Sequence, residues 1–206
     1  MQTPVPLLQV ALFLGVAIGW RAWVQRRLHG TSGIVVFRSA RTFDLARDLS
    51  LLALPVLLVG AGIAAWRAPE LLEFTGPIAA LRGPHALQGG VVVTSLAVAL
   101  IVTAQVQMGG SWRVGIDDGA RPGLVTHGLF AFCRNPIYLG MYLWHTGFVL
   151  SVPTWGNVAV LAAMLAVIPV QVRREERYLL DTYGDEFRAY AARTGRFLPA
   201  LGLLSS

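Results

Sequence analysis

The sequence predicts an all-α, polytopic integral membrane protein with about five transmembrane helices and a cytoplasmic C-terminal helical cap. Three observations support this fold class. The 206 residues are 55% hydrophobic and only 14% charged, a composition that is typical of membrane proteins. Long apolar segments approach the roughly 20 residues that a membrane-spanning helix needs. The arginines cluster in alternate segments between these apolar runs.

Apolar length places the predicted spans. The first three cover residues 5–24, 49–66 and 88–108. We expect the first of these to be a span and not a cleaved signal peptide, because no basic residue precedes it. The last apolar run, residues 136–172, is too long for one helix, and its middle reads SVPTWGN, residues 151–157. Since proline, glycine and asparagine favour turns, we divide this run into two spans, which gives five in total.

The distribution of arginine predicts the orientation. All 17 basic residues are arginine, and the three regions that hold most of them are residues 21–47, 113–134 and 173–206. These regions fall on one side of a five-span topology, whereas Arg67 and Arg82 fall on the other. The positive-inside rule then predicts a protein of the cell (inner) membrane with its N-terminus outside and its C-terminus cytoplasmic. Because the arginines flank spans and no recognition motif accompanies them, we expect contacts with membrane lipids and none with nucleic acid.

The residues that could support chemistry lie in the second half of the chain. Residues 1–108 form a three-span N-terminal region with few ionisable side chains, and residues 109–206 contain a polar loop, the last two spans and the tail. The four histidines are dispersed and Cys133 is the single cysteine, so we expect no internal disulfide and no bound metal. Cys133 precedes an arginine that would favour its thiolate, so an inert and a reactive cysteine both stay open.

The fourth predicted span begins with the segment RNPIYLGM, residues 134–141. Asparagine is a favoured N-cap and proline a favoured first helical residue, so Asn135 and Pro136 are predicted to start the helix. Tyr138 lies four residues after Arg134, on the same side of the helix opening. The free backbone N–H groups of a helix start suit an anion. The segment is therefore either a capped span with interfacial anchors or one wall of a binding pocket.

Two acids, Glu175 and Glu176, follow the fifth predicted span among three arginines. They form either a solvated charge cluster with i,i+3 and i,i+4 pairs or part of a site. Further on, Gly184 can end one helix in a left-handed conformation and Asp185 can cap the next one. The helix predicted over residues 186–193 carries an apolar face, which indicates that it folds back over the protein; this face consists of Phe187, Tyr190 and Ala191.

The stretch GLVTHGLFAFCRNPIYLGM followed by EERYLLDTYGDEFRAYAARTGRFLP resembles the isoprenylcysteine carboxyl methyltransferase family, whose wider group includes phospholipid N-methyltransferases. The resemblance covers about residues 105–200 and rests on the ordered set of RNPxY, the paired acids, a glycine eight residues later and the closing RFLP. It implies a bacterial or archaeal member that uses S-adenosyl-L-methionine to methylate a lipophilic or amphiphilic small molecule or lipid. The alternative is a non-catalytic membrane lipid-binding or assembly protein that retains the fold.

The resemblance also implies a cofactor pocket made by the last two spans and the tail. Its candidate catalytic residues are Glu175, which corresponds to the acid that holds the cofactor, and Gln171, one helical turn earlier on the same face. Phe130 and Asn135 stand where other members have tyrosine and histidine. The implied cofactor-binding residues are Pro122, Gly123, Leu124, Val125, Phe130, Arg134, Asn135, Pro136, Ile137, Tyr138, Glu175 and Glu176.

Gln171 is a departure from the family pattern. The family usually has an arginine there that is thought to bind the carboxylate of the substrate, and a neutral amide does not supply that charge. Because an uncompensated carboxylate is costly in a pocket of low dielectric constant, the substitution predicts a methyl acceptor that is uncharged or cationic at the accepting atom. The other possibility is that Arg174 reaches the same place and substitutes for the family arginine.

Overall fold

The computed structural model describes residues 3–34, 42–113 and 123–203, with the backbone alone for residues 42–52. Within these ranges the chain is helical and contains no β-strand. The first rod consists of α1 (Val5–Phe13), a π-helical segment (Leu14–Trp20) and α2 (Arg21–His29), which follow one another without a break. The first predicted span therefore continues by one further turn, until Gly30 ends α2 with a φ of 73°.

The remaining long helices match the predicted apolar segments and extend most of them, whereas a short helix after the second predicted span was not predicted. They are α3 (Thr42–Arg67), α4 (Glu70–Glu73), α5 (Pro84–Met108), α6 (Pro136–Ser151), α7 (Trp155–Tyr183) and α8 (Asp185–Arg193). Three helical rods are long and apolar enough to cross a membrane, namely Val5–His29, Pro84–Ser111 and Trp155–Tyr183. Helix α6 has 16 residues, and α3 contributes a shorter apolar stretch, Ala53–Arg67.

The predicted turn between the last two long helices is present and is shorter than the SVPTWGN segment. The Thr154 hydroxyl accepts a hydrogen bond from the backbone N–H of Asn157 at 3.2 Å and so caps α7. Asn157 lies inside the first turn of α7, where its side chain donates to the Val152 carbonyl at 2.8 Å. Its own carbonyl lies 3.1 Å from Nε2 of the buried His145. These contacts fix the angle between α6 and α7.

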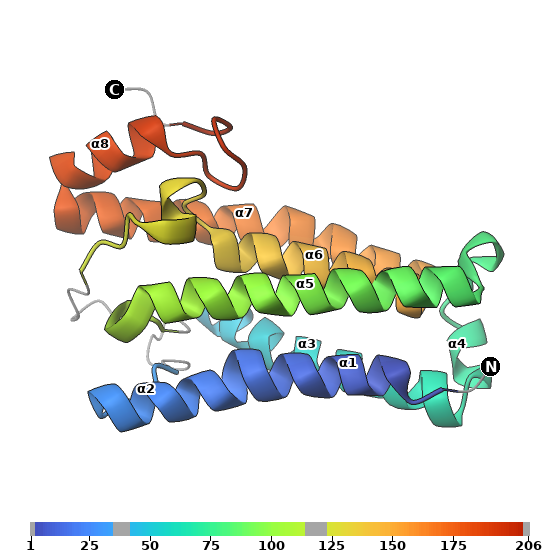
Figure 1. The fold of residues 1–206 in the computed structure, drawn as a ribbon. Helices are drawn as coiled ribbons and strands as arrows, with labels where there is room; N and C mark the ends of the chain where they lie inside the picture. Colours follow the sequence, from blue (N-terminus) through green and yellow to red (C-terminus); the bar gives the residue numbers. More distant parts are fainter. Residues whose placement is uncertain (1–2, 35–41, 114–122, 204–206) are drawn as a thin grey trace.

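Successive long helices run in opposite directions, so that the ends of α2, α5 and α7 and the start of α6 lie at the same end of the bundle (Figure 1). This end also holds α8 and the segment that follows it, whereas the start of α1 lies at the opposite end. Most arginines of the described segments belong to the helix ends gathered here, and Arg67 and Arg82 lie at the far end of α3 and just before α5. The arrangement in space thus agrees with the predicted alternation of arginine-rich segments.

The core forms where α1, α5 and α6 meet. The rings of Phe13 and Trp144 stack with centroids 4.6 Å apart, and Trp144 stacks on Phe148 at 5.2 Å. Helices α5 and α6 approach closely because glycines face each other: a Cβ atom at Gly90 would lie 2.6 Å from the Gly147 carbonyl oxygen. Small residues at such crossings allow helix backbones to pack in membranes. We infer that any larger side chain at Gly90 would separate α5 from α6.

Helix α8 folds back onto the end of α7, as the sequence predicts. Its apolar face, Phe187, Tyr190 and Ala191, is buried and packs with Leu124, Leu179, Leu180 and Tyr183. The predicted capping role of Asp185 is wrong. Gly184, with a φ of 52°, occupies both the end of α7 and the N-cap position of α8. Asp185 is therefore the first helical residue, and its carboxylate pairs with exposed Arg188 at 2.8 Å.

Candidate active site

The residues of the predicted site gather where the start of α6, the end of α7 and the segment after α8 meet. Asn135 occupies the N-cap position of α6, since its carbonyl accepts from the Leu139 N–H at 3.1 Å. Its side chain does not cap the helix, contrary to the prediction, and donates instead to the Arg196 carbonyl at 3.0 Å. The Arg134 N–H likewise donates to the Gly195 carbonyl at 2.9 Å. The start of α6 is thus bonded to the C-terminal segment.

Arg134 is buried and uses its whole guanidinium group within the protein. Its Nε and Nη2 atoms donate to Glu176 Oε1 at 3.0 and 2.8 Å. The remaining N–H groups donate to the carbonyls of Ala191 and Gly202, each at 2.9 Å, and of Thr194. A guanidinium has five N–H donors, so these five bonds saturate it. A direct bond from Arg134 to a ligand would require one of them to break.

Glu176 is also buried, and its carboxylate lies between two arginines. Besides Arg134, it accepts from Arg196, whose Nε lies 3.0 Å and whose Nη2 lies 2.6 Å from Glu176 Oε2. This hydrogen bonding raises the pKa of the Arg196 guanidinium. Glu176 is therefore not part of a solvated charge cluster. Arg196 was not among the predicted site residues, although it lies in the RFLP segment that contributes to the family resemblance.

Glu175 belongs to a second, separate group of side chains. The Tyr138 hydroxyl donates to Glu175 Oε1 at 2.7 Å, and Gln171 Nε2 donates to the same oxygen at 2.8 Å. The bond between Gln171 and Glu175 confirms that the two residues share one face of α7. Gln171 is 7% exposed, and its Oε1 atom is buried without a hydrogen-bond partner in the described part of the chain. An unpaired carbonyl oxygen and a carboxylate thus lie one helical turn apart.

The other predicted residues lie around these two groups. Gly123, Leu124 and Val125 form the loop before a 3-10 turn (Gly128–Ala131). Phe130 is buried in that turn, and its carbonyl accepts from the Tyr190 hydroxyl at 2.7 Å. Pro136 is buried at the first residue of α6. Ile137 packs against the core between the long helices, and Pro122 lies outside the described residues. Within the described ranges, no group of three or more His, Cys, Asp or Glu side chains could hold a metal ion.

Cys133 lies beside this cluster, with Sγ 3.7 Å from the Arg196 carbonyl oxygen. Burial raises the pKa of its thiol, and this effect exceeds the opposing effects of the Asn135 backbone N–H and the Arg134 charge. The neutral thiol is a poor nucleophile. We therefore expect iodoacetamide at pH 8 to alkylate Cys133 much more slowly in the folded protein than after denaturation, as measured by mass spectrometry. Equal rates in the two states would identify Cys133 as a reactive cysteine.

Known proteins resemble this chain in sequence and in fold. Residues 85–186 match the phospholipid methyltransferase family. The cobalt-zinc-cadmium resistance protein CzcN of Cupriavidus metallidurans is 30% identical over 155 residues, which are 73% of this chain and 69% of that protein. Methanethiol S-methyltransferase 1 of Bradyrhizobium diazoefficiens is 36% identical over 82 residues, 40% of this chain and 28% of that protein.

A solved structure has the same arrangement of helices. The eukaryotic intramembrane Ras methyltransferase ICMT (isoprenylcysteine carboxyl methyltransferase) matches with a TM-score of 0.56 and 20% sequence identity, over 94% of this chain and 76% of that chain. The fold and the sequence matches together define an integral membrane methyltransferase. The chain belongs to the isoprenylcysteine carboxyl methyltransferase-like family, within the wider phospholipid methyltransferase group, and its methyl donor is S-adenosylmethionine.

Proposed function

We propose that this protein methylates a lipophilic or amphiphilic acceptor that is uncharged or cationic at the accepting atom. The observation that supports this proposal is the orientation of Gln171. Its amide nitrogen is bonded to Glu175, and its carbonyl oxygen is buried without a partner in the described chain. A carbonyl oxygen accepts hydrogen bonds, so it suits a thiol, a hydroxyl or an amine and repels a carboxylate. The carboxylate of an anionic acceptor would be buried against the Gln171 carbonyl oxygen, and two negatively polarised groups would then face each other away from water.

The residues present also fit the cofactor. When bound, S-adenosylmethionine supplies a methyl group attached to a positively charged sulfur. Glu175 would hold the cofactor ammonium through a charge-assisted hydrogen bond, and Tyr138 and Gln171 would fix the direction of the carboxylate. Alignment in a water-poor site is the main requirement of such a transfer. The predicted walls of this pocket are Pro122, Gly123, Leu124, Val125, Phe130, Asn135, Pro136 and Ile137.

We propose a different role for Arg134 and Glu176 from the one implied by the resemblance. Because the five donors of Arg134 bond Glu176 and three backbone carbonyls, Arg134 acts by holding the segment after α8 against the start of α6. Arg196 completes the same ion cluster. The two adjacent acids thus have different roles. Glu175, oriented by Tyr138, binds the cofactor, whereas Glu176 attaches the tail that covers the pocket.

The helix lengths support a recessed site that lipid-soluble acceptors can reach. At 1.5 Å per residue, α7 is about 44 Å long and α6 only about 24 Å, whereas the hydrocarbon core of a bilayer is about 30 Å thick. We propose five spans, namely the first rod, α3, α5, α6 and α7, with the arginine-rich end and the α8 cap in the cytoplasm of a cell with an anionic inner leaflet. The C-terminal end of α7 then projects beyond the membrane, and the start of α6 lies below its surface.

A substrate panel tests the proposal. Purified protein in nanodiscs receives labelled S-adenosylmethionine together with a long-chain thiol, an amine lipid or farnesylcysteine. We expect methylation of the thiol or the amine and only trace methylation of the farnesylcysteine carboxylate. The relative named for methanethiol, an uncharged acceptor, supports this expectation. Gln171→Arg should raise the trace activity on the carboxylate, because it supplies the missing charge.

The same panel distinguishes Gln171 from Arg174. Robust activity of the wild-type protein on farnesylcysteine, lost in Arg174→Ala, would overturn the proposal and identify Arg174 as the group that binds the carboxylate. Gln88→Arg is the matched control, because Gln88 is exposed near the start of α5, whereas Glu175 lies near the end of α7. If carboxylate methylation also increased in this control, the effect of Gln171→Arg would come from the added positive charge and not from its position at residue 171.

A further inference from the structure

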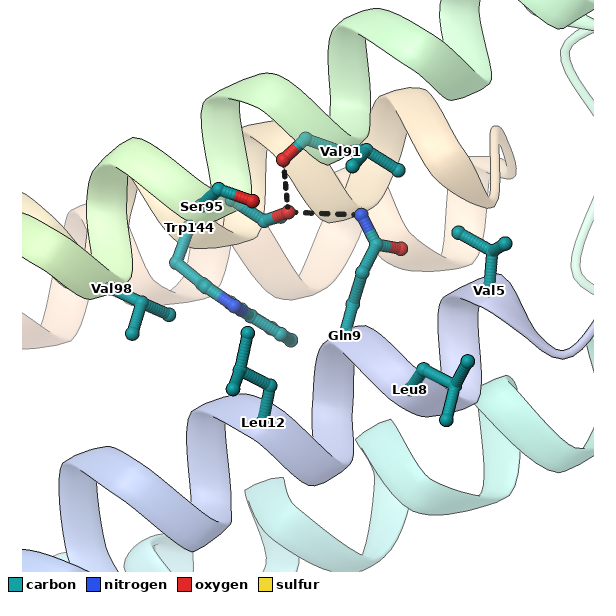
Figure 2. A pocket seen from close by; sticks show the side chains of 9 residues that line it. Val5, Leu8, Gln9, Leu12, Val91, Ser95, Val98 and Trp144 are labelled. Carbon is teal, nitrogen blue, oxygen red and sulfur yellow. Dashed lines mark hydrogen bonds between the residues drawn. The ribbon is translucent and has the colours of Figure 1, made fainter.

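A second pocket lies between α1 and α5, in the half of the bundle away from α8. Its volume is about 190 Å³, and Trp144 of α6 closes its inner side. Figure 2 shows the side chains that line it, most of them from α1 and α5. Leu8 and Leu12 at its rim are 60% and 49% exposed, so in a membrane protein they face hydrocarbon. The lining residues are Val5, Leu8, Gln9, Leu12, Val91, Thr94, Ser95, Val98 and Trp144.

The pocket wall contains an acceptor without a donor. Gln9 is 7% exposed, and its Nε2 atom donates to the hydroxyl oxygens of Thr94 and Ser151, both at 2.9 Å. Those hydroxyls donate in turn to backbone carbonyls, Thr94 to Gly90 at 2.9 Å and Ser151 to Gly147 at 3.2 Å. Since both hydroxyl protons are used, the network fixes which end of the amide faces them. Gln9 Oε1 is left buried without a partner in the part of the chain that the structure describes.

The same wall contains a donor without an acceptor. Trp144 is 2% exposed, and its Nε1 atom is buried without a hydrogen-bond partner among the described residues. Unpaired polar atoms are costly away from water. A ligand hydroxyl group donates to an acceptor, so it would supply the donor that Gln9 Oε1 lacks. The lining residues include no charged side chain, which disfavours a phosphate or an ammonium headgroup.

The position and the size of the pocket agree with a lipid. Gln9 lies four residues after the start of α1, about 6 Å along the helix axis, so in the proposed topology it lies near the outer end of the first rod. A cavity of about 150 Å³ lined by apolar side chains binds benzene, so this slightly larger one has room for a polar group and the first part of a chain. The rest of the chain would follow the exposed leucines of α1.

We propose that this pocket binds one uncharged lipid through a hydroxyl group, at a site separate from methyl transfer. The ligand class is a diacylglycerol-like or long-chain alcohol, whose hydroxyl group is recognised by Gln9. The proposal does not depend on the substrate assignment, because the pocket shares no lining residue with the group around Glu175.

Binding of labelled 1,2-dioctanoylglycerol to the full chain in detergent tests the proposal. We expect saturable binding of one molecule per chain, and at least about tenfold weaker binding of the 3-O-methyl ether, which lacks the donor. Ser95→Phe should fill the pocket and abolish saturable binding. Because Ser95 is exposed at the rim, this variant should fold, as circular dichroism will verify. Leu96→Phe is the matched control, since Leu96 is 66% exposed and is not part of the lining, and it should bind as the wild type does.

Two outcomes would overturn the proposal. Equal binding of the alcohol and its methyl ether would show that the hydroxyl is not recognised. Binding that is unsaturable, or equally strong in Ser95→Phe and in the wild type, would show partition into the detergent micelle and no site. Gln9→Leu provides a second measurement, because it removes the acceptor and leaves an apolar side chain in the pocket wall. This variant should bind the alcohol as weakly as the wild type binds the ether.

Discussion

Glu176→Ala should be the most destabilising single substitution in the cytoplasmic half of the proposed topology, with a loss of about 3–5 kcal/mol in the free energy of unfolding. Glu176 is 7% exposed, and its carboxylate forms ion pairs with Arg134 and Arg196 at distances of 2.8 and 2.6 Å. Without it, a buried guanidinium keeps three carbonyl partners and loses its counter-charge. Unfolding in detergent, followed by circular dichroism against denaturant concentration, measures the loss.

Glu73→Ala is the matched control for this experiment. Glu73 forms an ion pair with Arg82 at 2.7 Å, a length similar to that of the Glu176 pairs, but both side chains are about half exposed. Exposed pairs contribute at most about 1 kcal/mol, so this variant should unfold almost as the wild type does. If Glu176→Ala is no more destabilising than Glu73→Ala, the ion cluster does not hold the C-terminal segment in place.

The long helices could be predicted because their signal is local. Apolar length located each of them, and Pro153 marked the turn between α6 and α7. The apolar face of α8 followed from helical spacing alone. The length of α6 could not be predicted, since the apolar run continues through the turn and only the Thr154 cap shows where α7 begins. The π-helical segment of the first rod has no signal in its apolar sequence.

The sequence predicted which residues belong to the candidate site, but not which of them contact one another across different helices. Gln171 and Glu175 are four residues apart on one helix, so their contact follows from sequence. Adjacent residues on a helix point about 100° apart, so Glu175 and Glu176 had to face different surroundings. The sequence does not say which acid meets Arg134, because that depends on how α6 lies against α7. For the same reason, the partners of Asn135 and the role of Arg196 emerge only from the fold.

Glu175→Gln should lower the affinity for S-adenosylhomocysteine or S-adenosylmethionine by about ten- to hundredfold while the protein stays folded. A charge-assisted hydrogen bond contributes about 1.5–3 kcal/mol, and the neutral amide replaces it with an ordinary one. The fold should tolerate the change, because the amide oxygen can still accept from Tyr138 and Gln171, which now bond Oε1 at 2.7 and 2.8 Å. Isothermal titration calorimetry in detergent measures the affinity.

The matched control for this variant is Glu186→Gln, on the exposed surface of α8. It removes the same charge from the same end of the protein, so any loss of affinity that it shares with Glu175→Gln reflects the overall field and not a contact. Tyr138→Phe adds a graded test: it removes one of the two donors that orient the carboxylate, and it should weaken binding by about fivefold, corresponding to about 1 kcal/mol. If Glu175→Gln binds the cofactor as the wild type does while Tyr138→Phe does not, then the tyrosine contacts the cofactor itself and Glu175 only positions the tyrosine.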